Sequence, residues 1–217
     1  MHSFSPKSID FLWDLSVNNN KTWFEENKHR FATEIQTPTK ALAQLVYEAL
    51  DTTHPALGLS CKVTRIYRDA RRVRGGEPYK TNLWFFIEKP TLLDSTATAG
   101  FWFGIEKEVW NYGLGFYAPK AGTMAKLRQR IDQNPKQLET LIKGIADSEF
   151  TLTGEDYKRT KTPAHGRLGA WYNKKQLALM CQASPSEGLF EAGLGERLVA
   201  GYLRLVPLYL YLSSLDE

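Results

Sequence analysis

Basic residues gather in one short part of this chain, residues 62–80. This segment holds seven Lys and Arg residues and two acidic residues, so it carries a formal charge of +5. The whole chain carries only +4, so the residues outside the segment sum to −1. Because the planar donors of arginine match two oxygens at once, such a concentration suits the recognition of phosphate or carboxylate groups.

The functional interpretation of the basic segment is an anion site. We expect Arg65, Arg68 and Lys80 to neutralise the charge of a phosphorylated or otherwise anionic small molecule, as donors aimed at an anion do. The hydroxyls of Tyr67 and Tyr79 would supply hydrogen bonds to it. The protein would then bind this substrate or act on it.

Other residues can complete such a site. Asp69 can orient a basic partner or act as a base, and Lys158, Arg159 and His165 can close the site from a polar loop. Asp69 and His165 are therefore the candidates for a catalytic role. The sequence determines neither the reaction, if there is one, nor a cofactor, nor the oligomeric state.

Two other interpretations remain open. On a regular strand Arg65 and Arg68 point to opposite faces unless the strand bulges, and both can then brace the sheet through ion pairs with carboxylates. Alternatively, the chain is a non-enzymatic nucleic-acid or protein-interaction module. Residues 71–74 would then touch phosphates while exposed aromatic side chains stack on bases.

The sequence favours no metal site. Its four histidines form no His-Glu-x-x-His or similar ligand spacing. Glu88 and Glu106 lie at the ends of predicted strands and can hold a cation with Asp69 only if those strands are neighbours. Pairing with the arginines is the favoured interpretation of these carboxylates.

The composition is that of a globular protein, and we expect it in the cytoplasm by default. Hydrophobic residues make up 42% of the chain and charged residues 24%. Cys61 and Cys181 are too few for a disulfide framework and are interpreted as reduced thiols. The N-terminus lacks the apolar stretch of a secretory signal, and the apolar run 203–215 is too short for a membrane span.

The elements that must position these residues predict an α+β fold. We expect one domain over residues 1–217, with a helical segment at 1–55, the main sheet region at 60–120, helices at 123–146, and an irregular segment with a C-terminal helix at 149–217. Consecutive strands with short links indicate mostly antiparallel pairing. The central sheet is aromatic-rich and is packed by the N-terminal and C-terminal helices.

Capping residues and aromatic triplets refine this prediction. Ser5 and Asn20 are expected to cap the first two helices, and Thr37-Pro38 to begin a third. The triplets Trp84-Phe85-Phe86 and Phe101-Trp102-Phe103 are interpreted mainly as core, and otherwise as stacking surfaces.

Four stretches stand together as a pattern: Phe11-Leu12-Trp13-Asp14-Leu15 through Asn18-Asn19-Asn20-Lys21-Thr22-Trp23-Phe24, Arg65-Ile66-Tyr67-Arg68-Asp69-Ala70-Arg71 with Pro78-Tyr79-Lys80-Thr81, Gly113-Leu114-Gly115-Phe116-Tyr117-Ala118-Pro119, and Tyr157-Lys158-Arg159. In kind and order they resemble the domain of unknown function 2461 family. The resemblance implies an α+β cytoplasmic protein of bacterial type and no agreed activity.

The chain departs from that family's pattern beside the Pro-Tyr-Lys-Thr motif. The family usually carries a further acidic residue and a lysine just before the motif, and often a histidine after it. Here Arg74-Gly75-Gly76-Glu77 precedes Pro78 and Asn82 follows Thr81. No role is expected for the residues that are missing.

Overall fold

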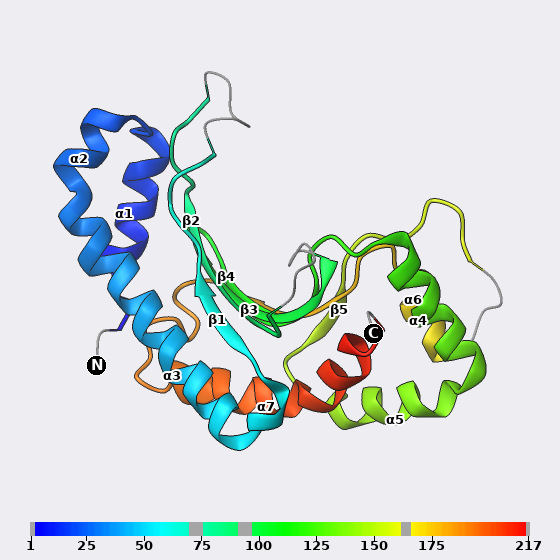
Figure 1. Cartoon of the computed structure of the whole chain (residues 1–217). Coiled ribbons are helices and arrows are strands. Elements are labelled where there is room, and N and C mark those ends of the chain that lie inside the picture. The colour runs from blue at the N-terminus through cyan, green and yellow to red at the C-terminus, as the bar shows by residue number, and fades with distance from the viewer. Residues whose placement is uncertain (1–2, 70–75, 91–96, 162–165, 216–217) are drawn as a thin grey trace. The chain divides into compact units, whose positions relative to one another are not determined.

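The computed structural model describes residues 3–69, 76–90, 97–161 and 166–215. Three helices come first along them, four strands follow, and helices and short strands make up the rest, as Figure 1 shows. The helices are α1 (Pro6–Val17), α2 (Lys21–Arg30), α3 (Thr37–Thr53), α4 (Ala121–Gln133), α5 (Pro135–Ile145), α6 (Gly169–Tyr172) and α7 (Leu194–Ser213). The strands are β1 (Ser60–Val63), β2 (Asn82–Glu88), β3 (Ala99–Glu106), β4 (Trp110–Phe116), β5 (Thr151–Thr153) and β6 (Ala178–Ala183).

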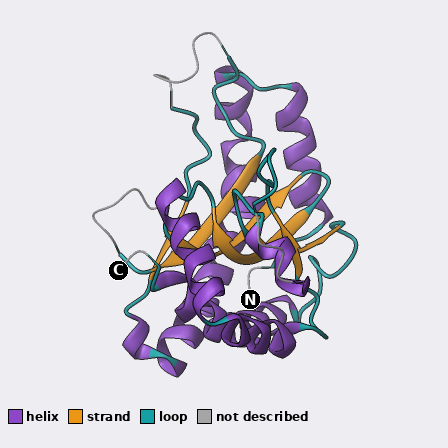
Figure 2. Cartoon of the chain, turned by 90° about the vertical axis from the view of Figure 1, so that its right-hand side faces the viewer, coloured by secondary structure: helices purple, strands orange, loops and turns teal. Residues whose placement is uncertain are grey.

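The described strands form a six-stranded antiparallel sheet in the order β1-β2-β3-β4-β6-β5, drawn in orange in Figure 2. The predicted α+β fold, with helices at both ends of the chain, is confirmed. Burial alternates along β2, where Leu83, Phe85 and Ile87 are buried and their neighbours half-buried, as expected for a strand with one core face. Phe101 and Phe103 of β3 are fully buried, so the predicted aromatic core is present.

The chain divides into two compact units. The first comprises Met1–Ile87, Trp102–Tyr112 and Gln182–Val199. The second comprises Glu88–Phe101, Gly113–Cys181 and Ala200–Glu217. The organisation of residues 1–217 as one domain stays a prediction, and the units are described separately.

In the first unit, α1 and α2 lie side by side (Figure 1). The rings of Phe11 and Trp23 lie 5.9 Å apart, and the Arg30 guanidinium is 2.7 Å from the Asp14 carboxylate. Asn20 begins α2 by accepting a hydrogen bond from the Trp23 N–H at 3.0 Å, which confirms the predicted cap. The contacts between the two helices and the cap at Asn20 together stabilise the turn that joins them.

The third helix, α3, begins at Thr37 as predicted. A π-helical turn, Phe31–Gln36, precedes it and joins it to α2 without a break. Pro38 has no N–H to donate to the Glu34 carbonyl four residues earlier. That carbonyl accepts instead from the hydroxyl of Ser8, at 2.7 Å. Ser8 is fully buried, so this hydrogen bond anchors α1 against the π turn.

In the second unit, helices pack around the C-terminal half of α7. Arg130 of α4 donates to the Tyr211 carbonyl at 2.6 Å, and the ring of Phe101 lies 4.9 Å from that of Tyr209. The helix continues through Pro207 to Ser213. No helix of the described residues has the length and apolar character to cross a membrane.

Gly115 of β4 allows the backbone at the start of β6 to approach β4 closely. A Cβ at this position would collide with the Leu177 carbonyl and would lie 2.6 Å from Cα of Ala178. We predict that Gly115→Ala lowers the free energy of unfolding by about 1–3 kcal/mol, because the obstacle is backbone and cannot turn away. Urea denaturation followed by circular dichroism measures the loss.

Gly122→Ala is the matched control, since an added Cβ there meets nothing within 4 Å. Gly122 lies in α4, where alanine is the better helix former. We expect this variant to be as stable as the original chain or more so. A Gly115→Ala protein as stable as the Gly122→Ala protein would contradict the close packing of β4 and β6.

Candidate functional site

The basic segment runs antiparallel to the chain that leads into β2, but its ladder is interrupted. Thr64 donates its N–H to the Trp84 carbonyl at 2.8 Å, and the Ile66 carbonyl accepts from the Lys80 N–H at 2.7 Å. These two bonds are two residues apart on one strand and four apart on the other. The chain before β2 therefore bulges by two residues.

Beyond the bulge, an antiparallel bridge pairs Tyr67 with Tyr79, and the Arg68 N–H donates to the Pro78 carbonyl at 2.9 Å. Directly opposite residues of a ladder share a face, and the residues next to them point to the other face. Arg68 and Lys80 consequently share one face as near neighbours. The side chains of the two tyrosines share the opposite face.

The two tyrosines pack against α2. The ring of Tyr79 stacks on Phe24 at 4.0 Å and is only 2% exposed. Burial, and then the neighbouring Tyr67 and Glu25, raise the pKa of Tyr79. Tyr67 lies 5.3 Å from the Tyr79 ring and is 48% exposed. Tyr79 is therefore a core residue, whereas Tyr67 presents half of its surface to solvent.

Asn19, in the turn between α1 and α2, holds the peptide of Tyr79 from the other side. Its Oδ1 accepts from the Tyr79 N–H at 3.1 Å, and its Nδ2 donates to the Tyr79 carbonyl at 3.0 Å. The amide thus pairs with this backbone as a further strand would. The sequence analysis assigned a role in this turn to Asn20 alone, as a cap, and missed the role of Asn19. The signal that could have revealed it is the run of three asparagines, because one of them, Asn20, is enough to cap α2.

Arg68 is oriented by the same peptide. Its Nε donates to the Tyr79 carbonyl at 2.9 Å, and one terminal nitrogen lies 3.6 Å from the Glu77 carboxylate. The side chains of this ion pair are 38% and 54% exposed, so the pair contributes little to stability. The predicted bracing role of the arginine is therefore present in a weak form, and the guanidinium keeps donors for another partner.

Arg65 and Lys80 complete a cluster of three cations with Arg68. Burial lowers the pKa of Lys80, and the charges of Arg68 and Arg65 lower it further. Within the part of the chain that the structure describes, the side chains of Arg65 and Lys80 make no hydrogen bond or ion pair. We call Arg65, Arg68 and Lys80 the first-unit cluster.

The other predicted site residues lie elsewhere. Asp69 is exposed and has a partner of its own. Lys158 and Arg159 are exposed residues of the second unit. His165 lies outside the described residues, as does the arginine loop 70–75.

The described residues include no group of three or more His, Cys, Asp or Glu side chains that could hold a metal ion. Glu106, one of the carboxylates considered for a cation, is half-buried. Its pKa is raised by burial and by the nearby Glu108.

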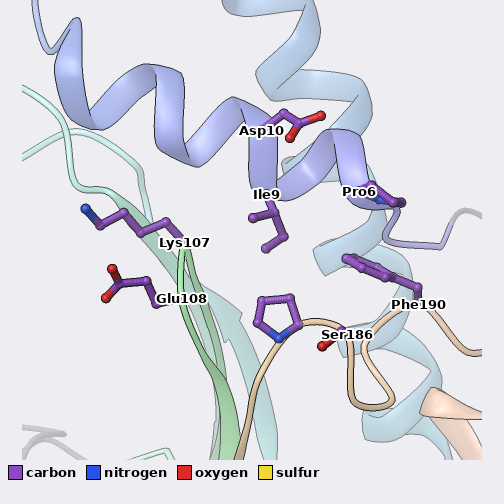
Figure 3. A pocket seen from close by; sticks show the side chains of 8 residues that line it. Pro6, Ile9, Asp10, Lys107, Glu108, Ser186 and Phe190 are labelled. Carbon is purple, nitrogen blue, oxygen red and sulfur yellow. The ribbon is translucent and has the colours of Figure 1, made fainter.

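A hollow of about 370 Å³ lies elsewhere on the first unit (Figure 3). It is lined by Pro6, Ile9, Asp10, Lys107, Glu108, Pro185, Ser186 and Phe190. Two of these residues are acidic, and the Lys107 ammonium lies over the Trp13 ring at 4.0 Å. None of the predicted site residues lines this hollow, and its charge does not suit an anion.

Comparison with protein families gives a match over residues 7–211 to a family described as "Conserved hypothetical protein (DUF2461)". The chain belongs to this family. The resemblance carried by the four sequence stretches is thereby confirmed. No curated protein matches the chain.

We predict that Asn19→Ala destabilises this DUF2461 chain by about 1–3 kcal/mol, because a backbone N–H and carbonyl of a buried residue lose their side-chain partner. Asn134→Ala is the control: Asn134 also lies just before a helix, and it is exposed with no capping bond from its side chain. Its effect should stay within about 0.5 kcal/mol. Equal urea midpoints for the two variants would show that the Asn19 amide is dispensable.

Proposed function

We propose that this DUF2461 protein binds a phosphorylated or other anionic small molecule through Arg65, Arg68 and Lys80. The observation that carries the proposal is the placement of Arg68 and Lys80 on one face of the ladder, where the described residues supply one weak carboxylate partner, Glu77. Such an arrangement is unfavourable on its own because the charges repel one another and Lys80 is partly desolvated. An anion between them converts the repulsion into attraction.

The orientation of Arg68 supports the same proposal. Its Nε is fixed by the Tyr79 carbonyl, so the plane of the guanidinium is set before any ligand arrives. A pre-oriented fork loses less conformational entropy when it binds an oxyanion. Tyr67 and Tyr79 then act chiefly by holding the ladder on α2, since their rings lie on the other face. If the bound anion is also transformed, Asp69 is our candidate base.

We predict that Lys80→Ala and Arg68→Ala each weaken anion binding by about tenfold or more, which corresponds to the loss of a charged hydrogen bond. Isothermal titration with a panel of nucleotides and sugar phosphates measures the dissociation constants. Lys40→Ala is the control, because Lys40 is an exposed lysine of α3 outside the cluster. Unchanged binding in both cluster variants would refute the proposed function.

Binding should also couple to the protonation of Lys80. The pKa of Lys80 is lowered from its usual 10.5, and an anion favours the ammonium form, so binding raises the pKa and takes up protons. Affinity should therefore fall as the pH rises through the pKa of Lys80 in the folded protein. In the absence of ligand, the contribution of Lys80 to stability rises with pH up to about 10.5, because the unfolded chain binds more protons there.

Nuclear magnetic resonance of ¹³C-dimethylated lysines measures this coupling directly. The Lys80 signal should titrate below the usual 10.5, and its pKa should rise when the bound nucleotide or sugar phosphate is added. A Lys80 pKa at the usual value, or one that the anion leaves unchanged, would contradict the coupling.

The exposure of the cluster favours one second candidate, a nucleic-acid-binding module. Arg65 and Arg68 are exposed, and Tyr67 is 48% exposed, so an extended polyanion can reach all three. Fluorescence anisotropy with a single-stranded oligonucleotide tests this candidate. Binding to a phosphate backbone should weaken steeply with salt, and a flat or absent response counts against it.

A further inference from the structure

Two cationic side chains of the second unit make cation–π contacts with the same aromatic ring, that of Tyr157. The guanidinium carbon of Arg128 in α4 lies 5.2 Å from the centre of the Tyr157 ring, and the Lys161 ammonium lies 4.8 Å from the same centre. The two charges can therefore be no further apart than the sum of these distances, which is about one Debye length at 0.1 M salt. Lys158 and Arg159 follow Tyr157 directly in the sequence and are exposed.

The Arg128 guanidinium finds no hydrogen-bond partner among the residues that the structure describes. One terminal nitrogen, Nη1, is buried and bonds to nothing among the described residues. Its other guanidinium nitrogens are not among the buried atoms and form no hydrogen bond with those residues either. A half-buried guanidinium held only by a ring is costly, because cation–π contact replaces a small part of its hydration.

The nearby carboxylates serve other groups. Glu155 and Asp156, just before Tyr157, lie 3.0 Å and 3.1 Å from the ammonium groups of Lys175 and Lys174. Asp132, one turn after Arg128 on α4, accepts a hydrogen bond from the Tyr172 hydroxyl at 3.1 Å. Residues 162–165, which follow Lys161, are Thr-Pro-Ala-His and include no acid. None of these acids forms an ion pair with Arg128 or Lys161.

We propose that Arg128 and Lys161, brought together by Tyr157, form a second anion site that binds a phosphate dianion. The accessible guanidinium nitrogens of Arg128 donate to two phosphate oxygens, and Lys161 neutralises the remaining charge. Lys158 and Arg159 raise the local concentration of the anion from the exposed side. The site lies wholly in the second unit and does not depend on the first-unit cluster.

The test uses the full chain in an Arg68→Ala, Lys80→Ala background, which removes the first-unit cluster. Inorganic phosphate at pH 8 is titrated while the Nε–Hε signal of Arg128 is followed by nuclear magnetic resonance. We expect a saturable shift of that signal. Lys161→Gln should raise the dissociation constant about tenfold, because one charged contact is lost. Lys126→Gln, an exposed lysine on the same helix, is the matched control and should leave it unchanged.

Acetate at matched ionic strength separates a dianion site from general screening, and it should cause no saturable shift. Because the readout is a signal of Arg128 itself, loss of the first-unit cluster does not affect the answer. A linear or absent shift overturns the proposal, as do equal effects of Lys161→Gln and Lys126→Gln or of acetate and phosphate. Circular dichroism confirms that each variant is folded.

Discussion

The peptide of Tyr79 is the point on which the arrangement of the first unit depends. It is held between an antiparallel bridge to Tyr67 and the side-chain amide of Asn19, while the ring stacks on Phe24. A two-stranded ladder this short is marginal alone, and an unpaired edge would leave buried polar groups without partners. The amide from the helical turn supplies what a third strand would supply. It also leaves the Tyr79 carbonyl placed to orient Arg68.

This arrangement requires the turn between α1 and α2 to stay in place. Two contacts, one near each end of α1, hold this helix and the turn after it in place. Near the start, the Ser8 hydroxyl bonds to the Glu34 carbonyl that Pro38 cannot serve, and near the end, Asp14 pairs with Arg30. The π turn that follows α2 is therefore a binding site for α1 as well as an accommodation of the proline. Helix packing in this unit positions a strand-like segment, and through it the cations.

Local signals in the sequence were sufficient to predict many of the helices and strands. They were insufficient to predict how distant segments pair with one another. The Asn20 cap and the alternation of Leu83, Phe85 and Ile87 were predictable, because a cap and a strand period depend on neighbours in sequence. The two-residue bulge depends on pairing between distant segments, so the register that sets Tyr67 opposite Tyr79 could not be derived. The neighbours of Arg128 were equally hidden, since Tyr157 lies far along the chain. The cations of the proposed anion site were named from the sequence, and their role stays a prediction.

The unpaired cations are not a consequence of composition. The chain has 24 acidic residues for 28 basic ones, and it uses acids readily where it pairs them, as at Lys28, Lys174 and Lys175. Exposed pairs of that kind are easy to form and contribute little. A half-buried lysine beside two arginines and a buried guanidinium nitrogen would benefit far more from a carboxylate, and neither receives one from the residues that the structure describes. Both proposals rest on these charges, because an anion from outside the chain would compensate them.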